Sequence, residues 1–162
     1  MKKFELTNEF ITNMFGTKLF RIRALVEFGD VEAGELGGYV EKESNLGHDD
    51  NAWVYDNAWV YGDAQVSGGA WVYGDARVCG NGDYAYAHGF GSVNRTTTFF
   101  RLKDGGVGVR CGCFYGTLAQ FRDKIRETHG ESAIAEEYLD LAALMEKRFR
   151  RTGNEQKTEE ES

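Results

Sequence analysis

Three histidines are the residues of this chain that most directly suggest acid–base chemistry: His48, His88 and His129. Imidazole is the commonest general base in enzymes because it titrates near neutral pH. His48 precedes the central part of the chain and His88 follows it. A base placed between neighbouring copies of the chain is therefore one hypothesis, but the sequence alone assigns no catalytic residue.

Cys111, Cys113 and His129 form a second candidate, because thiolate and imidazole bind zinc and can also act as a nucleophile and base. A fourth zinc ligand is missing from the local spacing, and two cysteines in a strand share a face by alternation alone. Asp63 and Asp75 could bind calcium, but no second set of carboxylates accompanies them. We expect these residues to serve packing and turns, and we predict no metal and no cofactor.

A polar cluster follows the central region and is a candidate ligand-binding site. Its members are Ser92, Asn94, Arg95 and Thr97. Hydroxyl, amide and guanidinium groups in this density can bind an anion or a nucleotide. The alternative interpretation is a strand whose polar face is solvated.

The element that must position these groups is a repeat of five hexapeptides over residues 50–79, with alanine at the third and valine at the fifth place. Gly, Asn or Asp occupies the first two places, which suits corners that need positive φ. The spacing predicts a mainly β fold: a short left-handed parallel β-helix with roughly 18 residues per turn. Its inward residues would be Val54, Val60, Val66, Val72 and Val78.

Six aromatic residues fall at outward positions of the repeat, and we predict that they bind a partner. They are Trp53, Tyr55, Trp59, Tyr61, Trp71 and Tyr73. With 18 residues per turn, Trp53 would stack beneath Trp71 on one outer face. A contiguous apolar patch of this kind usually marks an interface. The alternative is that the chain's own terminal segments cover it.

The flanks divide the chain into four parts: a β cap and lead-in over 1–45, the repeat over 46–90, a hairpin with two helices over 91–150, and a disordered acidic tail over 151–162. An N-terminal β-hairpin would cap one end of the repeat. The second helix carries an apolar stripe, which could form a twofold interface. The stripe comprises Ile134, Tyr138, Leu141, Met145 and Phe149.

Composition limits the choice of partners. The formal net charge is −7, so direct nonspecific binding to nucleic acid or to an anionic membrane is not expected. Three cysteines and a polar N-terminus favour a cytoplasmic protein. Because a repeat this short leaves its ends uncovered, we expect a homo-oligomer, with a dimer favoured over a trimer.

Several motifs together resemble hexapeptide-repeat proteins of bacteriophages and prophages. They are Gly37-Gly38-Tyr39-Val40, the Asn51-Ala52-Trp53-Val54-Tyr55 repeats, Thr96 to Phe100, Gly112-Cys113-Phe114 and Thr128-His129-Gly130. The resemblance implies a non-catalytic protein that self-associates and engages a host protein or protein–nucleic acid complex, as an inhibitor of antiviral defence such as an anti-CRISPR. Two alternatives remain: a sponge for a small nucleotide signal, and an acyltransferase like the uncharacterised bacterial β-helix proteins that the repeat also resembles.

Overall fold

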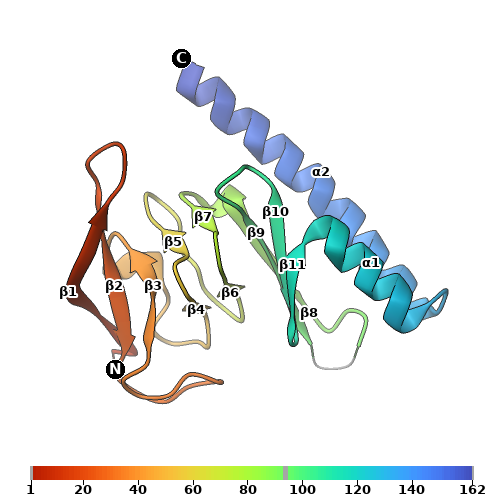
Figure 1. Ribbon diagram of the computed structural model, residues 1–162, viewed down its shortest axis with the longest axis horizontal. Coiled ribbons are helices and arrows are strands. Elements are labelled where there is room, and N and C mark those ends of the chain that lie inside the picture. The colour runs from red at the N-terminus through yellow and green to blue at the C-terminus, as the bar shows by residue number, and fades with distance from the viewer. Residues whose placement is uncertain (1, 93–94, 162) are drawn as a thin grey trace.

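The computed structural model describes residues 2–92 and 95–161, and it places side chains for residues 2–92 and 95–153. A five-stranded sheet lies at the N-terminal side (Figure 1). Its order is β1 (Phe4–Thr12), β2 (Lys18–Ala24), β3 (Leu36–Val40), β5 (Trp59–Val60) and β7 (Arg77–Val78). The first three strands pair antiparallel, and β3, β5 and β7 pair parallel.

Two further sheets complete the β structure. The short strands β4 (Trp53–Val54) and β6 (Trp71–Val72) form a parallel pair. The other sheet is antiparallel in the order β11 (Phe114–Thr117), β10 (Val107–Cys111), β9 (Thr96–Arg101) and β8 (Tyr84–His88). Two single-turn helices, η1 (Glu43–Asn45) and η2 (Asn81–Asp83), interrupt the loops.

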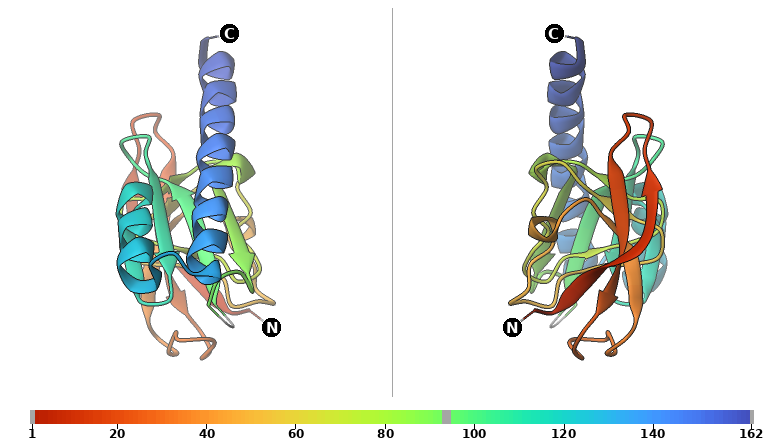
Figure 2. Two further views of the ribbon diagram at one scale, coloured as in Figure 1. Left: turned by 90° about the vertical axis from the view of Figure 1, so that its right-hand side faces the viewer. Right: turned by 90° about the vertical axis from the view of Figure 1, so that its left-hand side faces the viewer.

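The helices α1 (Leu118–His129) and α2 (Ala133–Glu161) cover one face of the four-stranded sheet, and α2 extends beyond the body of the molecule (Figure 2). A reciprocal cap fixes the start of α1. The Gln120 amide donates to Thr117 Oγ1 at 3.2 Å, and the Thr117 amide donates to Gln120 Oε1 at 2.9 Å. Residues 151–161, predicted as a disordered tail, continue α2.

The predicted fold class, a mainly β left-handed parallel β-helix, is wrong. The described residues form a mixed α/β structure with three separate sheets of five, two and four strands, and no sheet is closed or forms a solenoid. The physical reason lies at the sheet edges. The repeat contributes strands of only two residues, and the flanking segments pair with the repeat, as Tyr39 does with Trp59, and extend it into ordinary sheets.

The local consequences of the repeat are confirmed. Trp53 pairs with Trp71 and Trp59 pairs with Arg77, each across 18 residues. All five predicted valines, Val54, Val60, Val66, Val72 and Val78, are fully buried. Positive φ occurs at the first place of four hexapeptides: Asp56 (55°), Gly62 (61°), Gly68 (67°) and Gly74 (61°). At Gly62 a Cβ would also lie 2.6 Å from the Cys79 carbonyl oxygen, so this corner requires glycine.

Two apolar cores result. The first contains the repeat valines and alanines with Phe4, Ile22 and Trp53, and the second lies between the four-stranded sheet and the helices. Tyr138, Leu141, Met145 and Phe149 of the predicted stripe are buried in the second core, whereas Ile134 is exposed. Four of the five stripe residues are therefore packed within the chain, and the twofold interface remains a prediction.

Both predicted hairpins are present. β1 and β2 form the N-terminal one, in which β1 begins at Phe4 and β2 begins at Lys18. β9 and β10 form the C-terminal one, in which the Leu102 amide donates to the Gly106 carbonyl at 2.8 Å. Among the described residues, no helix has the length and apolar character needed to cross a membrane.

Candidate functional site

Trp53 does not lie on an outer face, so its predicted outward position is wrong. The side chain is fully buried. Phe4 and Phe28 pack edge-on against it, with ring centroids 6.3 Å and 5.2 Å away. The N-terminal segments thus cover this end of the predicted aromatic ladder, and the ring is not available to a partner.

The other five rings of the predicted surface are half-buried, and several are engaged within the chain. Tyr55 and Tyr73 stack at 4.1 Å with nearly parallel planes, as the 18-residue spacing indicated. The Arg110 guanidinium lies 4.4 Å from the Tyr73 ring centroid, and that of Arg77 lies 3.8 Å from the Trp59 centroid. The predicted binding face is therefore largely satisfied by the chain's own side chains.

Burial also changes the ionisation of these rings. It raises the pKa of Tyr61 to about 12, with further contributions from the nearby Cys79 and Asp83. Burial likewise raises the pKa of Tyr55, and the adjacent Tyr73 hydroxyl adds to the effect. These hydroxyls are neutral at physiological pH.

The most exposed large apolar residues lie elsewhere, at the tip of the β1–β2 hairpin. Met14 is 90% exposed and Phe15 is 85% exposed. The tip projects from the body of the molecule (Figure 1). The available signal was the adjacency of two large apolar residues to Gly16-Thr17.

The hairpin tip is a hydrogen-bonded turn. Asn13 Oδ1 accepts from the amides of Phe15 and Thr17, each at 3.0 Å. The Gly16 amide donates to the Asn13 carbonyl at 3.0 Å, and Gly16 adopts φ of 84°. Met14 and Phe15 are therefore carried by a backbone whose conformation is fixed before any contact is made.

The predicted ligand cluster is only partly assembled. Thr97 is buried, and its hydroxyl contacts Cys111 Sγ at 3.2 Å, which indicates a packing role. The Ser92 amide donates to the Tyr138 hydroxyl at 2.9 Å and ties its loop to α2. Asn94 lies outside the described residues. Among the described members of the cluster, Arg95 is the exposed one.

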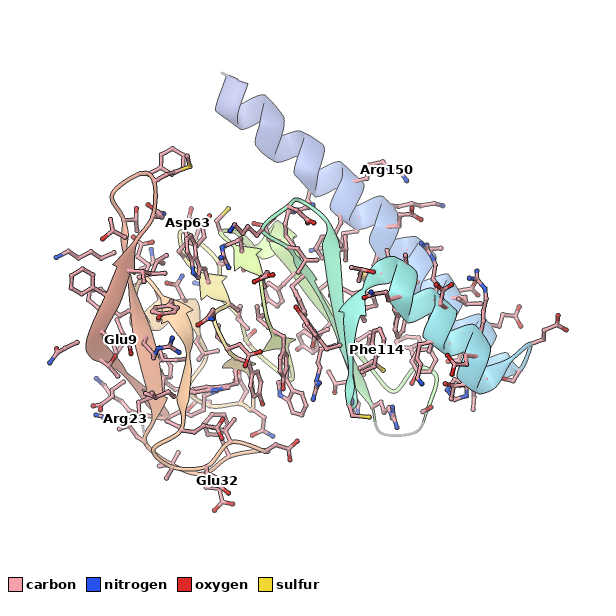
Figure 3. The ribbon with its side chains drawn as sticks, in the orientation of Figure 1. Glu9, Arg23, Glu32, Asp63, Phe114 and Arg150 are labelled. Atoms are coloured by element: carbon pink, nitrogen blue, oxygen red, sulfur yellow. The ribbon has the colours of Figure 1, made fainter. Side chains whose placement is uncertain are left out.

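Arg95 lines two adjoining cavities. The first, called here the helix-side cavity, has a volume of about 260 Å³ and is also lined by Lys124, Thr128 and His129 of α1. Its apolar wall includes Phe121 and Phe114, and Phe114 is labelled on β11 beside α1 in Figure 3. The second, called here the ring-side cavity, has a volume of about 280 Å³ and is lined by Arg95 together with Asn51, Gly69, Trp71, Thr96 and Gly112.

The histidines lie at separate places. His48 Nδ1 accepts from the Lys3 amide at 3.1 Å, and its ring stacks on Phe4 at 4.4 Å. His88 Nδ1 lies 2.8 Å from Thr96 Oγ1. His129 stacks against Tyr138, with 5.9 Å between ring centroids. These contacts explain each ring by packing or hydrogen bonding.

The cysteines do not form a metal site with His129. Cys111 is buried and Cys113 is exposed, although both line the helix-side cavity together with His129. Among the side chains that the structure places, in residues 2–92 and 95–153, no group of three or more His, Cys, Asp or Glu could hold a metal ion.

No protein-family model matches this chain, and no curated protein sequence matches it.

Proposed function

We propose that this chain is a non-catalytic binding protein that engages a macromolecular partner through the tip of its β1–β2 hairpin. The observation that carries the proposal is the near-complete exposure of Met14 and Phe15 side by side on a turn. Single exposed apolar residues are common on protein surfaces, but a projecting pair is typical of an anchor that inserts into a partner's pocket.

The geometry of the hairpin tip favours tight insertion. Its turn is closed by the Asn13 side chain and by the backbone, so little backbone entropy is lost on binding. Burial of a Met or Phe side chain contributes roughly 1.5–3 kcal/mol. The pair can therefore supply much of the binding free energy of a moderate complex.

The charge of the whole molecule, −7, favours a basic partner. The carboxylates that produce it lie outside the β1–β2 hairpin, which itself carries Glu5 and Glu9 against Lys18, Arg21 and Arg23. Complementary charge speeds association and selects among partners. The resemblance to phage proteins supports a host protein or protein–nucleic acid complex as the partner, and antiviral defence as the setting.

The test is site-specific photo-crosslinking in cells. A benzophenone amino acid at position 15 should give one discrete adduct that untagged wild-type protein competes away. The matched control is the same probe at Leu144, which is 58% exposed and belongs to α2 rather than to the hairpin. Absence of a specific adduct at position 15, or the same adducts from both positions, would contradict the proposal.

A further inference from the structure

We infer that the two cavities around Arg95 form one binding site for a nucleotide, with the phosphate in the helix-side cavity and the flat ring in the ring-side cavity. The two cavities meet at Arg95, which lines both. Gly112, which lines the ring-side cavity, lies between Cys111 and Cys113, which line the other. The helix α1, which supplies Lys124, lies on the opposite side of the molecule from the β1–β2 hairpin (Figure 1). The site shares no residue with the hairpin tip, so it is independent of the proposed function.

The helix-side cavity gathers cationic groups that have no other role in the described part of the chain. No hydrogen bond or ion pair with another described residue engages the side chains of Arg95 or Lys124. By contrast, Arg122 on the same helix binds Glu146 at 2.8 Å, and Arg101 binds Asp83 at 3.1 Å. Because both cations line one cavity, they are available together to an external anion.

The lining of the helix-side cavity supports this assignment. The lining includes Thr128 and His129 in addition to Lys124, and it contains no Asp or Glu. Charge-assisted hydrogen bonds from guanidinium and ammonium groups are the usual means of holding a phosphate. The backbone that carries Arg95 is fixed, because its carbonyl accepts from the Gly89 amide at 3.1 Å at the base of the β8–β9 hairpin.

The ring-side cavity offers a surface for a flat group. Trp71 lines it and is half-buried, with its Nε1 donating to the Asn51 carbonyl at 3.3 Å. The indole is therefore held in place while part of it faces the cavity. Aromatic side chains bind nucleobases by stacking, and this contributes about 1–3 kcal/mol per base. Thr96 and Asn51 add polar groups at the edge of the cavity.

The class of ligand follows from the pairing of these features. A free phosphate would use only the cationic side, and an apolar ligand would use only the walls. A molecule with an anionic end and a flat ring uses both, and the two cavities of about 260 and 280 Å³ suit the two halves of a nucleotide.

The test is isothermal titration of the full-length protein with ADP, inorganic pyrophosphate and adenosine as probes. ADP should bind more tightly than either fragment, and added salt should weaken ADP and pyrophosphate but not adenosine. Arg95→Gln and Lys124→Gln should each weaken ADP binding about tenfold or more, because each removes a charged hydrogen bond. Both residues are exposed, so both variants are expected to fold.

The matched control is Arg122→Gln, which makes the same chemical change on the same helix at an arginine already paired with Glu146. It should change the affinity less than about twofold. Trp71→Leu should weaken ADP and adenosine while leaving pyrophosphate unchanged. No binding of ADP at millimolar concentration, equal affinity of Arg95→Gln and wild type, or pyrophosphate binding as well as ADP would each overturn the inference.

Discussion

Replacing Arg101 by methionine tests whether one buried ion pair holds the long helix on the sheet. Arg101 Nε donates to Asp83 Oδ1 at 3.1 Å. Its Nη2 donates to the Phe149 carbonyl at 2.8 Å and to the Thr152 hydroxyl at 2.9 Å, both on α2. The Asp83 side chain is only 1% exposed and that of Arg101 is 13% exposed. The guanidinium therefore connects β9, the η2 loop and α2 in one network.

The expected loss can be worked out from this network. In Arg101→Met the Asp83 carboxylate stays buried and still accepts from the Cys79 amide at 3.0 Å, but it loses its contact with the Arg101 guanidinium. Removing one partner of a buried ion pair costs about 3–5 kcal/mol. Thr152→Val is the matched control. It removes the hydroxyl that accepts from Arg101 and donates to the Phe149 carbonyl, removes no charge, and should cost about 1–2 kcal/mol.

Urea denaturation followed by far-UV circular dichroism measures both losses. If the buried charge is the cause, the double variant Asp83→Leu, Arg101→Met should be more stable than Arg101→Met alone, because both members of the buried ion pair are then replaced by apolar side chains. The reasoning would be refuted by a loss below about 1 kcal/mol for Arg101→Met. It would also be refuted if Asp83→Leu gave no recovery in the double variant.

Three other predictions follow from the same description. Val66→Asp places a charge in a fully buried position and should lower the free energy of unfolding by more than about 3 kcal/mol; Gln65→Asp at the exposed neighbour should change it little, and equal thermal melts would contradict this. At pH 8 a thiol reagent should label exposed Cys113 quickly and Cys79 slowly, because burial and the neighbouring Asp83 raise the pKa of Cys79 to about 12; mass spectrometry of the native protein would show the order. The pKa of Tyr61 rises from 10.0 to about 12 on folding, so its contribution to stability is full below pH 10 and is lost between pH 10 and 12; Tyr61→Phe should reduce this alkaline loss, and an unchanged pH profile would argue against it.

The repeat could be interpreted correctly from sequence where the answer depends on the chain's own spacing. Burial of Val54 and Val72, their pairing across 18 residues and the positive φ at Gly62 all follow from a six-residue period with turn-forming residues at fixed places. Such features are set by residues within one hexapeptide or by the residues 18 positions away with which it pairs. They do not depend on what lies beyond the repeat.

The fold class and the burial of Trp53 depend on segments remote in sequence, so neither could be predicted from the repeat. Phe4 lies about fifty residues before Trp53 and covers it. Tyr39 of β3 takes the edge beside Trp59 and extends the stack into a five-stranded sheet. Neither contact produces a repeat in the sequence. A flanking segment needs only to fit one edge of the sheet or one buried ring, and this requires no regular spacing.

The candidate sites divide in the same way. Arg95 could be selected from sequence because it stands in a dense polar cluster, but Lys124 and His129 come from a helix that only the fold brings beside it. Thr97 was selected by the same density, and the alternation of β9 points it into the core. The exposure of Phe15 was not foreseen, since an apolar residue beside a turn is as often buried by the next element.

The central claim is that the hairpin tip anchors the partner. The most direct test compares two proteins, the wild type and a Met14→Ser, Phe15→Ser variant, in their affinity for the partner identified by crosslinking. At roughly 1.5–3 kcal/mol for each buried side chain, the variant should bind at least about 100-fold more weakly while unfolding at the same temperature. Leu144→Ser, at an exposed apolar position on α2, should bind as the wild type does. Equal affinity of the wild type and the Met14→Ser, Phe15→Ser variant would show that the hairpin tip is not the anchor.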